Sequence, residues 1–225
     1  MLRLCILGLL LIIPFAGLPG VSATLKVPLH YPTIQAAVDA AVAGDTILIA
    51  PGIYEELVTI DEKTDITIKG DVTFTPEETE CCPDIWDEVS KVVIKGRFWI
   101  LNSRNITVEA ITFSNGVLVR GRVTSPTEKV TFRYVQIIVS HKDGIDFVGI
   151  YKDIKLVGCN ISENGWDGIH LKDWGDGVLI DHCCINNNGR LRPTGVGIRI
   201  GPYVKNVVIK NNCLVGNAFA AIHPG

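Results

Sequence analysis

Two short phrases of the sequence contain residue types that perform acid–base chemistry. In KDGIDF and WDGIHL, an aspartate lies two residues before an isoleucine, and a polar residue follows that isoleucine. The aspartates are Asp143 and Asp167, and the polar residues are Asp146 and His170. Like charges a few ångströms apart raise the pKa of one carboxyl group, which creates an acid beside a base. The pattern therefore predicts Asp143, Asp167 and His170 as catalytic residues.

The isoleucine of these phrases recurs twice more, in IRI and AIH, and each time a polar residue follows it. Strand alternation sends the isoleucines inward and their successors outward. Stacking in register would align the outward residues in one column: Asp146, His170, Arg199 and His223. Such a strip suits the binding of a sugar acid, so we expect Asp146, Arg199, His223 and the nearby Trp174 to bind substrate. The alternative is a solvated sheet face whose polar residues serve solubility alone.

The column requires a scaffold of equal repeats, and the sequence contains one. Apolar segments with period-two alternation begin 24 residues apart at Ile106, Val130, Ile154 and Val178. The next begins 29 residues later at Val207, which fits a five-residue insertion, RLRPT. Each unit has about three short strands separated by turns rich in Asn, Gly and Asp. Units of this kind predict a parallel β-helix, an all-β solenoid.

One turn of the repeat carries an asparagine in three units, Asn164, Asn188 and Asn217. Buried asparagines in equivalent turns can bond from one coil to the next, as stacked amides do in cross-β structures. The asparagines therefore support stacking in register.

The segment before the repeats predicts a cap. Residues 33–43 begin with a helix-start signal and carry apolar residues at helical spacing: Ile34, Ala37, Val38 and Ala41. A helix there would cover the open end of the first coil, as a solenoid requires. Residues 75–90 interrupt the repeat and are predicted to form an excursion loop.

The stretch TIQAAVDAAVAGDTILIAPGIYEE resembles the opening of the pectin-lyase-like superfamily of right-handed parallel β-helices, and the later units resemble its generic repeats. The resemblance implies one right-handed β-helix domain over residues 24–225. KDGIDF is similar to the NTDGID element of polygalacturonases, which maps their first catalytic aspartate onto Asp143. Two other catalytic positions of that family differ, because Trp166 and Val196 replace an aspartate and a histidine. Elements typical of pectin methylesterases and alginate epimerases do not occur.

We therefore expect an exported protein that binds an acidic polysaccharide. If the protein is also an enzyme, we expect a hydrolase or lyase that cleaves this polysaccharide. No cofactor is expected, although Asp143, Asp146 and Asp167 could hold Ca²⁺ for a lyase, with Arg199 or His170 as base or uronate-orienting group. The alternative is a non-catalytic surface or periplasmic module, such as an envelope protein or an accessory protein of metalloenzyme maturation.

Composition restricts the partners and the location. Of 225 residues, 47% are hydrophobic and 20% charged, with a net charge of −3 and no basic run, so nucleic acid is not an expected partner. Residues 1–23 read as a cleaved signal peptide, with an apolar run too short and too interrupted for an anchor. No later segment predicts a membrane span, so we expect a secreted, periplasmic or cell-surface protein.

Six cysteines follow the signal segment. Cys159 and Cys183 share an inward column and are expected to be buried thiols. Cys184 and Cys213 share the next, outward column, where a bridge would fit, and the pair at 81–82 could tie the excursion loop. The last unit ends at AAIHPG without a covering segment, so we expect either a shortened version of a longer β-helix or a partner that covers the C-terminal coil.

Overall fold

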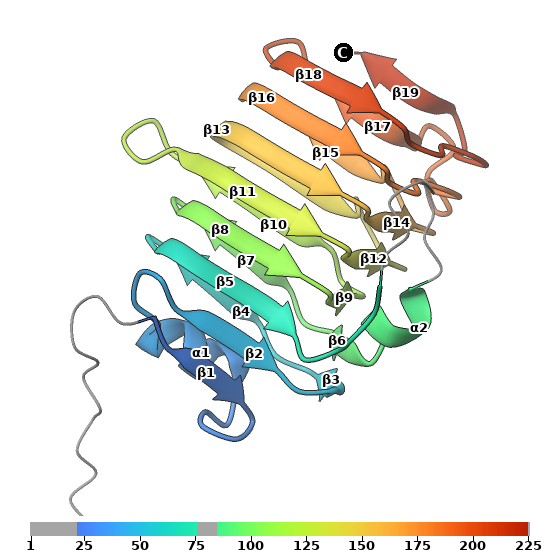
Figure 1. Ribbon diagram of the computed structural model, residues 1–225. Helices are drawn as coiled ribbons and strands as arrows, with labels where there is room; N and C mark the ends of the chain where they lie inside the picture. Colours follow the sequence, from blue (N-terminus) through green and yellow to red (C-terminus); the bar gives the residue numbers. More distant parts are fainter. Residues whose placement is uncertain (1–21, 76–84, 225) are drawn as a thin grey trace, which may run out of the picture.

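The structure is a computed structural model that describes residues 22–75 and 85–224 (Figure 1). The expected signal segment lies outside the described residues, apart from its last two, as do the cysteines at 81–82. No helix within the described ranges is long and apolar enough to span a membrane.

The chain winds into stacked coils, each contributing strands to three faces of parallel strands. Face A contains β1 (Thr24–Val27), β2 (Thr46–Ile49), β5 (Thr64–Gly70), β8 (Arg104–Glu109), β11 (Thr127–Arg133), the second part of β13 (Ile145–Val157), β16 (Trp174–Asp181) and β18 (Lys205–Lys210). Face B contains β3 (Gly52–Tyr54), β6 (Val92–Ile94), β9 (Thr112–Phe113), β12 (Gln136–Ile138) and β14 (Asn160–Ser162).

Face C positions the column of polar residues. It contains β4 (Val58–Asp61), β7 (Phe98–Leu101), β10 (Val117–Gly121), the first part of β13, β15 (Ile169–Leu171), β17 (Val196–Ile200) and β19 (Ala220–Pro224). β13 belongs to two faces because it runs through the corner between C and A without interruption. These faces confirm the predicted all-β parallel solenoid with three strands per unit.

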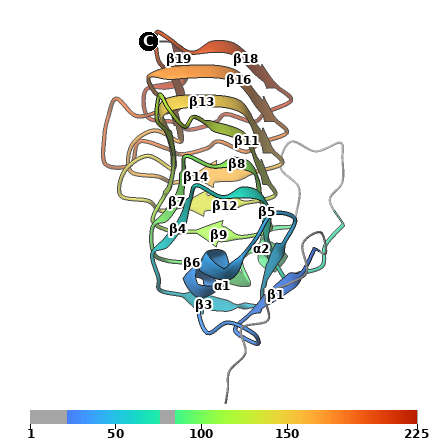
Figure 2. The ribbon, with the colours of Figure 1, turned by 90° about the vertical axis from the view of Figure 1, so that its left-hand side faces the viewer.

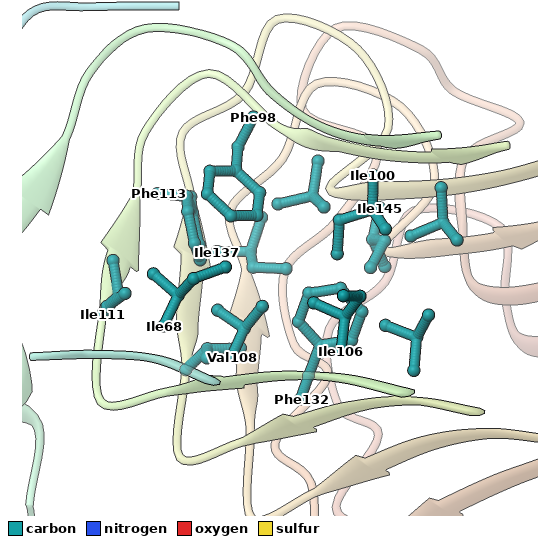
Figure 3. Packing of buried hydrophobic residues seen from close by; sticks show 14 of the residues in the cluster. Ile68, Phe98, Ile100, Ile106, Val108, Ile111, Phe113, Phe132, Ile137 and Ile145 are labelled. Carbon is teal, nitrogen blue, oxygen red and sulfur yellow. The ribbon is translucent and has the colours of Figure 1, made fainter. Parts of the chain in front are cut away.

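Apolar ladders fill the interior. The inward residues Ile145, Ile169 and Ile198 of face C are fully buried. Figure 3 shows side chains from different faces meeting inside the coils, among them Phe98 and Phe113, whose ring centroids are 4.8 Å apart. The core therefore holds each strand by its inward residues and leaves the alternate residues to the surface.

The cap forms at the expected place but is shorter than predicted. Helix α1 (Ile34–Ala40) begins after Thr33, whose Oγ1 accepts a hydrogen bond from the Ala36 amide. It ends at Ala40 rather than at residue 43, because Ala41 already has an extended backbone, with ψ 136°. The predicted apolar face is buried, and α1 packs against β1, β2 and β4 at the base of the stack (Figure 2).

The predicted excursion loop contains an element that was missed. Helix α2 (Trp86–Val89) is a single turn within residues 75–90, and Val89 and the preceding Ile85 are buried. Four residues are too few for a recognisable helical periodicity, which is why the sequence predicted only a loop.

The cysteine columns follow the predicted register. Cys159 and Cys183 are buried free thiols in successive coils, as expected. Cys184 and Cys213 are adjacent in register, and each is disulfide-bonded. Cys184 is buried rather than exposed on an outer surface. The pairing of Cys184 with Cys213 stays a prediction.

The C-terminal coil has β18 and β19 on its outermost edge (Figure 1). Several large apolar side chains on this coil are exposed, including Val208, Phe219 and Ile222.

The asparagine ladder is present and satisfies buried backbone groups between coils. Asn188 Nδ2 donates to Ile161 O at 2.9 Å and to Asn217 Oδ1 at 3.0 Å. Its Oδ1 accepts from the backbone amide and the side-chain amide of Asn164. The ladder therefore locks the turns before face C in register.

Replacing Asn188 by Ala should lower the free energy of unfolding by about 3 kcal/mol, because buried backbone groups of two coils lose their partners. Urea unfolding followed by circular dichroism measures the change. The control is Asn160→Ala, because among the described residues Asn160 Oδ1 accepts from Ser162 Oγ alone, two residues away in the same strand. Similar losses in both variants would contradict a special role for the ladder.

Candidate functional site

The predicted column exists. In the parallel register of face C, Asp146 pairs with His170, His170 with Arg199, and Arg199 with His223. The first three have partly exposed side chains on the outer surface, with exposed fractions of 24%, 19% and 20%. Strand alternation and a 24-residue repeat, with the five-residue insertion accommodated in a turn, therefore bring together residues that are far apart in the sequence.

Asp143 and Asp167 occupy equivalent turns in successive coils, directly before face C. Asp143 Oδ1 accepts from the Asp167 amide at 2.8 Å, and Asp167 Oδ1 accepts from the Val196 amide at 2.8 Å. Their side chains are 2% and 0% exposed. Each aspartate thus joins its own coil to the next, a structural contribution that the sequence pattern did not reveal.

Arg199 compensates the buried charge of Asp167. Its Nε lies 2.6 Å from Asp167 Oδ2 and its Nη2 lies 3.0 Å from Oδ1, so the two groups meet as a fork. Nη2 also donates to Thr194 O at 2.8 Å. The hydrogen bonds with Asp167 raise the pKa of Arg199.

His170 lies among three carboxylates. Its Nδ1 is 3.3 Å from Asp143 Oδ2, 3.4 Å from Asp167 Oδ2 and 3.9 Å from Asp146 Oδ1. The predicted catalytic residues Asp143, Asp167 and His170 are therefore in mutual contact, and Asp146 completes the group.

Lys172 is a member of the site that the prediction omitted. Its Nζ lies 2.5 Å from Asp146 Oδ1 and 3.4 Å from Asp143 Oδ2. The signal that could have found it is the period of two, which places Lys172 on the same outer surface as His170. We call the six residues Asp143, Asp146, Asp167, His170, Lys172 and Arg199 the charged cluster.

The pKa values of two carboxyl groups in the cluster diverge. Burial raises the pKa of Asp146 to about 6, with help from the charge of Asp143 and against the opposing effect of Lys172. Burial also acts on Asp143, but hydrogen bonds from His170 and the Asp167 amide outweigh it and lower the pKa of Asp143 to about 2. Asp146 is therefore the carboxyl group that can hold a proton near neutral pH, while Asp143 stays ionised.

The cluster does not fit Ca²⁺. One atom from each of Asp143, Asp167 and His170 lies within 4.8 Å of the others, which is the spacing of metal ligands. Calcium prefers six to eight oxygen ligands. Here both Asp167 oxygens already bind Arg199, and Lys172 lies against Asp143. The cations at these carboxylates are therefore side chains of the protein.

The other predicted substrate-binding residues do not join the cluster by side-chain contacts. Among the described residues, the side chains of Trp174 and His223 share no hydrogen bond or ion pair with the side chains of the cluster, although His223 is the register partner of Arg199. The Trp174 ring is 57% exposed and stacks on Tyr203, which is 59% exposed, with centroids 6.0 Å apart and planes inclined by 23°. His223 contacts the Phe219 ring at 5.8 Å. Tyr203 is a further residue that strand periodicity did not identify.

A basic and aromatic group borders the cluster on its other side. Trp166, which directly precedes Asp167, has Lys142 Nζ at 5.5 Å and Arg192 Cζ at 5.4 Å from its ring centroid. These distances are within the range of cation–π contacts.

The chain belongs to a known family. Residues 90–224 match the family model described as "Right handed beta helix region". The predicted resemblance is thus confirmed at the level of the right-handed parallel β-helix fold. A search of curated proteins finds no match.

Solved structures with this fold include two that share little sequence with the chain. A protein described as "Geobacillus virus E2 - ORF18" has a TM-score of 0.53 at 13% identity, over 79% of this chain and 38% of that one. Pectate lyase Pel9A has a TM-score of 0.49 at 17% identity, over 78% of this chain and 46% of the lyase. The chain spans less than half the length of either protein. At this identity the first similarity shows the fold alone, and the second supports no further conclusion.

Replacing Arg199 by Met should lower the free energy of unfolding by about 3–5 kcal/mol, because it leaves the Asp167 carboxylate buried without its cation. Urea unfolding measures the loss. The double variant D167N/R199M removes both charges and should recover most of the stability. Equal losses in the single and double variants would show that the ion pair is not the cause.

The raised pKa of Asp146 predicts a pH effect on stability. Between about pH 4 and pH 6 the folded protein binds more protons at Asp146 than the unfolded chain does, so its stability falls as the pH rises. The contribution of Asp143, whose pKa is lowered, is lost only below about pH 4.

As the pH rises from about 4 to about 6, the free energy of unfolding of the wild type should therefore fall relative to that of Asp146→Asn. Urea midpoints measured at intervals of half a pH unit provide the comparison. Parallel curves for the two proteins would exclude a raised pKa at Asp146.

Proposed function

We propose that the protein binds an acidic polysaccharide on the outer surface of face C. One observation carries the proposal: partly exposed Asp146, His170 and Arg199 align in adjacent strands, on a surface that continues toward the Trp174–Tyr203 pair. Strands spaced by about 4.8 Å present these groups at regular intervals along the stack. A polymer with a regular repeat is the kind of ligand that such a surface suits.

The exposed aromatic pair supports a sugar as the ligand. Lys172 follows His170 on the outer surface, and Trp174 follows at the corner where β15 gives way to β16. Two large rings that stack while more than half exposed offer a flat apolar surface at a wet site. The apolar face of a pyranose can lie on such a ring, while the charged cluster meets its polar groups.

Cleavage is a finer proposal, supported by the divergent pKa values of Asp143 and Asp146. Near pH 6 Asp146 can donate a proton while Asp143 stays ionised, which is the division of roles that glycoside hydrolysis uses. Asp167 is less suited to proton transfer, because Arg199 and the Val196 amide already bind its oxygens. In this proposal Asp146 protonates the leaving glycosidic oxygen, and His170 accepts the proton of the water that attacks the sugar. Asp143, 3.3 Å from His170 Nδ1, orients the imidazole ring.

The alternative is a non-catalytic surface or periplasmic module, and one observation favours it. Asp143 and Asp167 each bind the backbone of the next coil, so the cluster also has a structural use. The alternative predicts that changes at the exposed members of the cluster affect no binding activity. Export and a partner at the C-terminal coil remain proposals under either function.

Calorimetric titration of the mature protein with oligogalacturonate, oligomannuronate and a neutral cello-oligosaccharide tests the proposal. We expect binding to at least one uronate, and a loss of about tenfold in Trp174→Ala, because an aromatic contact contributes free energy of this order. Val123→Ala, on an exposed loop residue, is the control.

The same mixtures, assayed for new reducing or unsaturated ends, decide whether the protein also cleaves the polysaccharide, and Asp146→Asn should abolish this cleavage. Absence of binding to every glycan would reject the proposal.

A further inference from the structure

The five-residue insertion RLRPT lengthens one coil, and the structure places it beside the charged cluster. The loop that carries it precedes β17 and rests on the turn of the previous coil, where the Leu191 amide donates to Gly165 O at 2.8 Å. Thr194 O accepts from Arg199. In Figure 2 the loops that precede face C in the later coils project from the same side of the stack.

The insertion brings a second cation to Trp166. Arg192 comes from the inserted loop, and Lys142 comes from the equivalent turn of another coil. Both side chains are exposed, and they lie at nearly equal distances from the Trp166 ring centroid, 5.4 Å for Arg192 Cζ and 5.5 Å for Lys142 Nζ. The ring itself is partly exposed. Two cations and one aromatic surface thus meet one residue before Asp167.

Lys142 and Arg192 differ from the cations of the charged cluster, because no carboxylate in the described part of the chain pairs with them. Lys172 and Arg199 are committed to Asp146 and Asp167. Within residues 22–75 and 85–224, Lys142 and Arg192 form no ion pair. A ligand carboxylate would therefore find the available positive charge at Trp166.

We propose that Lys142, Trp166 and Arg192 form a subsite for one carboxylated sugar residue of the polysaccharide. The two cations attract the carboxylate, and contact with the Trp166 ring holds both of them at the turn before Asp167. This inference rests on the proposed function and deepens it, because it assigns recognition of the acidic group to residues outside the charged cluster. In this proposal the five-residue insertion has a function, because it supplies Arg192 to the subsite.

The test compares oligogalacturonate with its carboxyl-reduced, neutral counterpart of the same length, by calorimetry at two salt concentrations. The double variant K142A/R192A should bind the uronate at least about tenfold more weakly, because it loses two charge-assisted contacts. Its affinity should also become less sensitive to salt. Binding of the neutral counterpart should stay within about twofold of wild type.

Arg190→Ala is the matched control. Arg190 belongs to the same insertion and is also exposed, but it faces Glu163, with Nη1 at 3.8 Å from Oε2 and 3.2 Å from the Glu163 carbonyl oxygen. Its removal should change uronate affinity by no more than about twofold.

Two outcomes would overturn the subsite, and they are distinguishable. If the wild type binds no uronate, the proposed function fails and the subsite fails with it. If the wild type binds uronate and K142A/R192A binds it equally well, only the subsite fails. Circular dichroism of each variant establishes that the exposed substitutions leave the fold intact.

Discussion

The site depends on one constraint, the stacking of coils in register. Parallel ladders fix each coil about 4.8 Å above the last, so residues at equivalent positions of successive repeats lie directly above one another. Asn164, Asn188 and Asn217 enforce this alignment from inside the turns. The column of Asp146, His170 and Arg199 is its consequence outside. A shift of one residue in any coil would turn the polar residue of that coil inward and break the column.

Stacking also creates an electrostatic problem that the surrounding residues resolve. Equivalent turns bring Asp143 and Asp167 into successive coils, buried and bonded to backbone amides. Their charges require compensation, which Arg199 and Lys172 provide from the neighbouring face. The remaining carboxyl group, Asp146, is raised in pKa by burial and by Asp143. The same geometry that supports the turns therefore sets the proton affinity of the partly exposed Asp146.

The sequence predicted the fold and the column because both follow from periodicity. It could not predict which charges pair, since pairing depends on side-chain reach and burial, and so Lys172 was left out of the site. It also treated Asp143 and Asp167 as equivalent, whereas Arg199 binds only Asp167. The short helix α2 and the end of α1 at Ala40 were missed because single turns carry little periodic signal. The roles of the site residues stay predictions.

We propose that face C, with its charged cluster, is the ligand-binding surface. NMR titration of the labelled mature protein with an oligouronate would locate the bound ligand. We expect chemical-shift changes of the His170 and Arg199 side chains and of the Trp174 indole, all saturating at the same ligand concentration. A second surface provides the contrast: a groove of about 540 Å³ on face A, lined by residues that include Lys129 and Lys155. Shifts confined to that groove, or no shifts at all, would contradict ligand binding at face C.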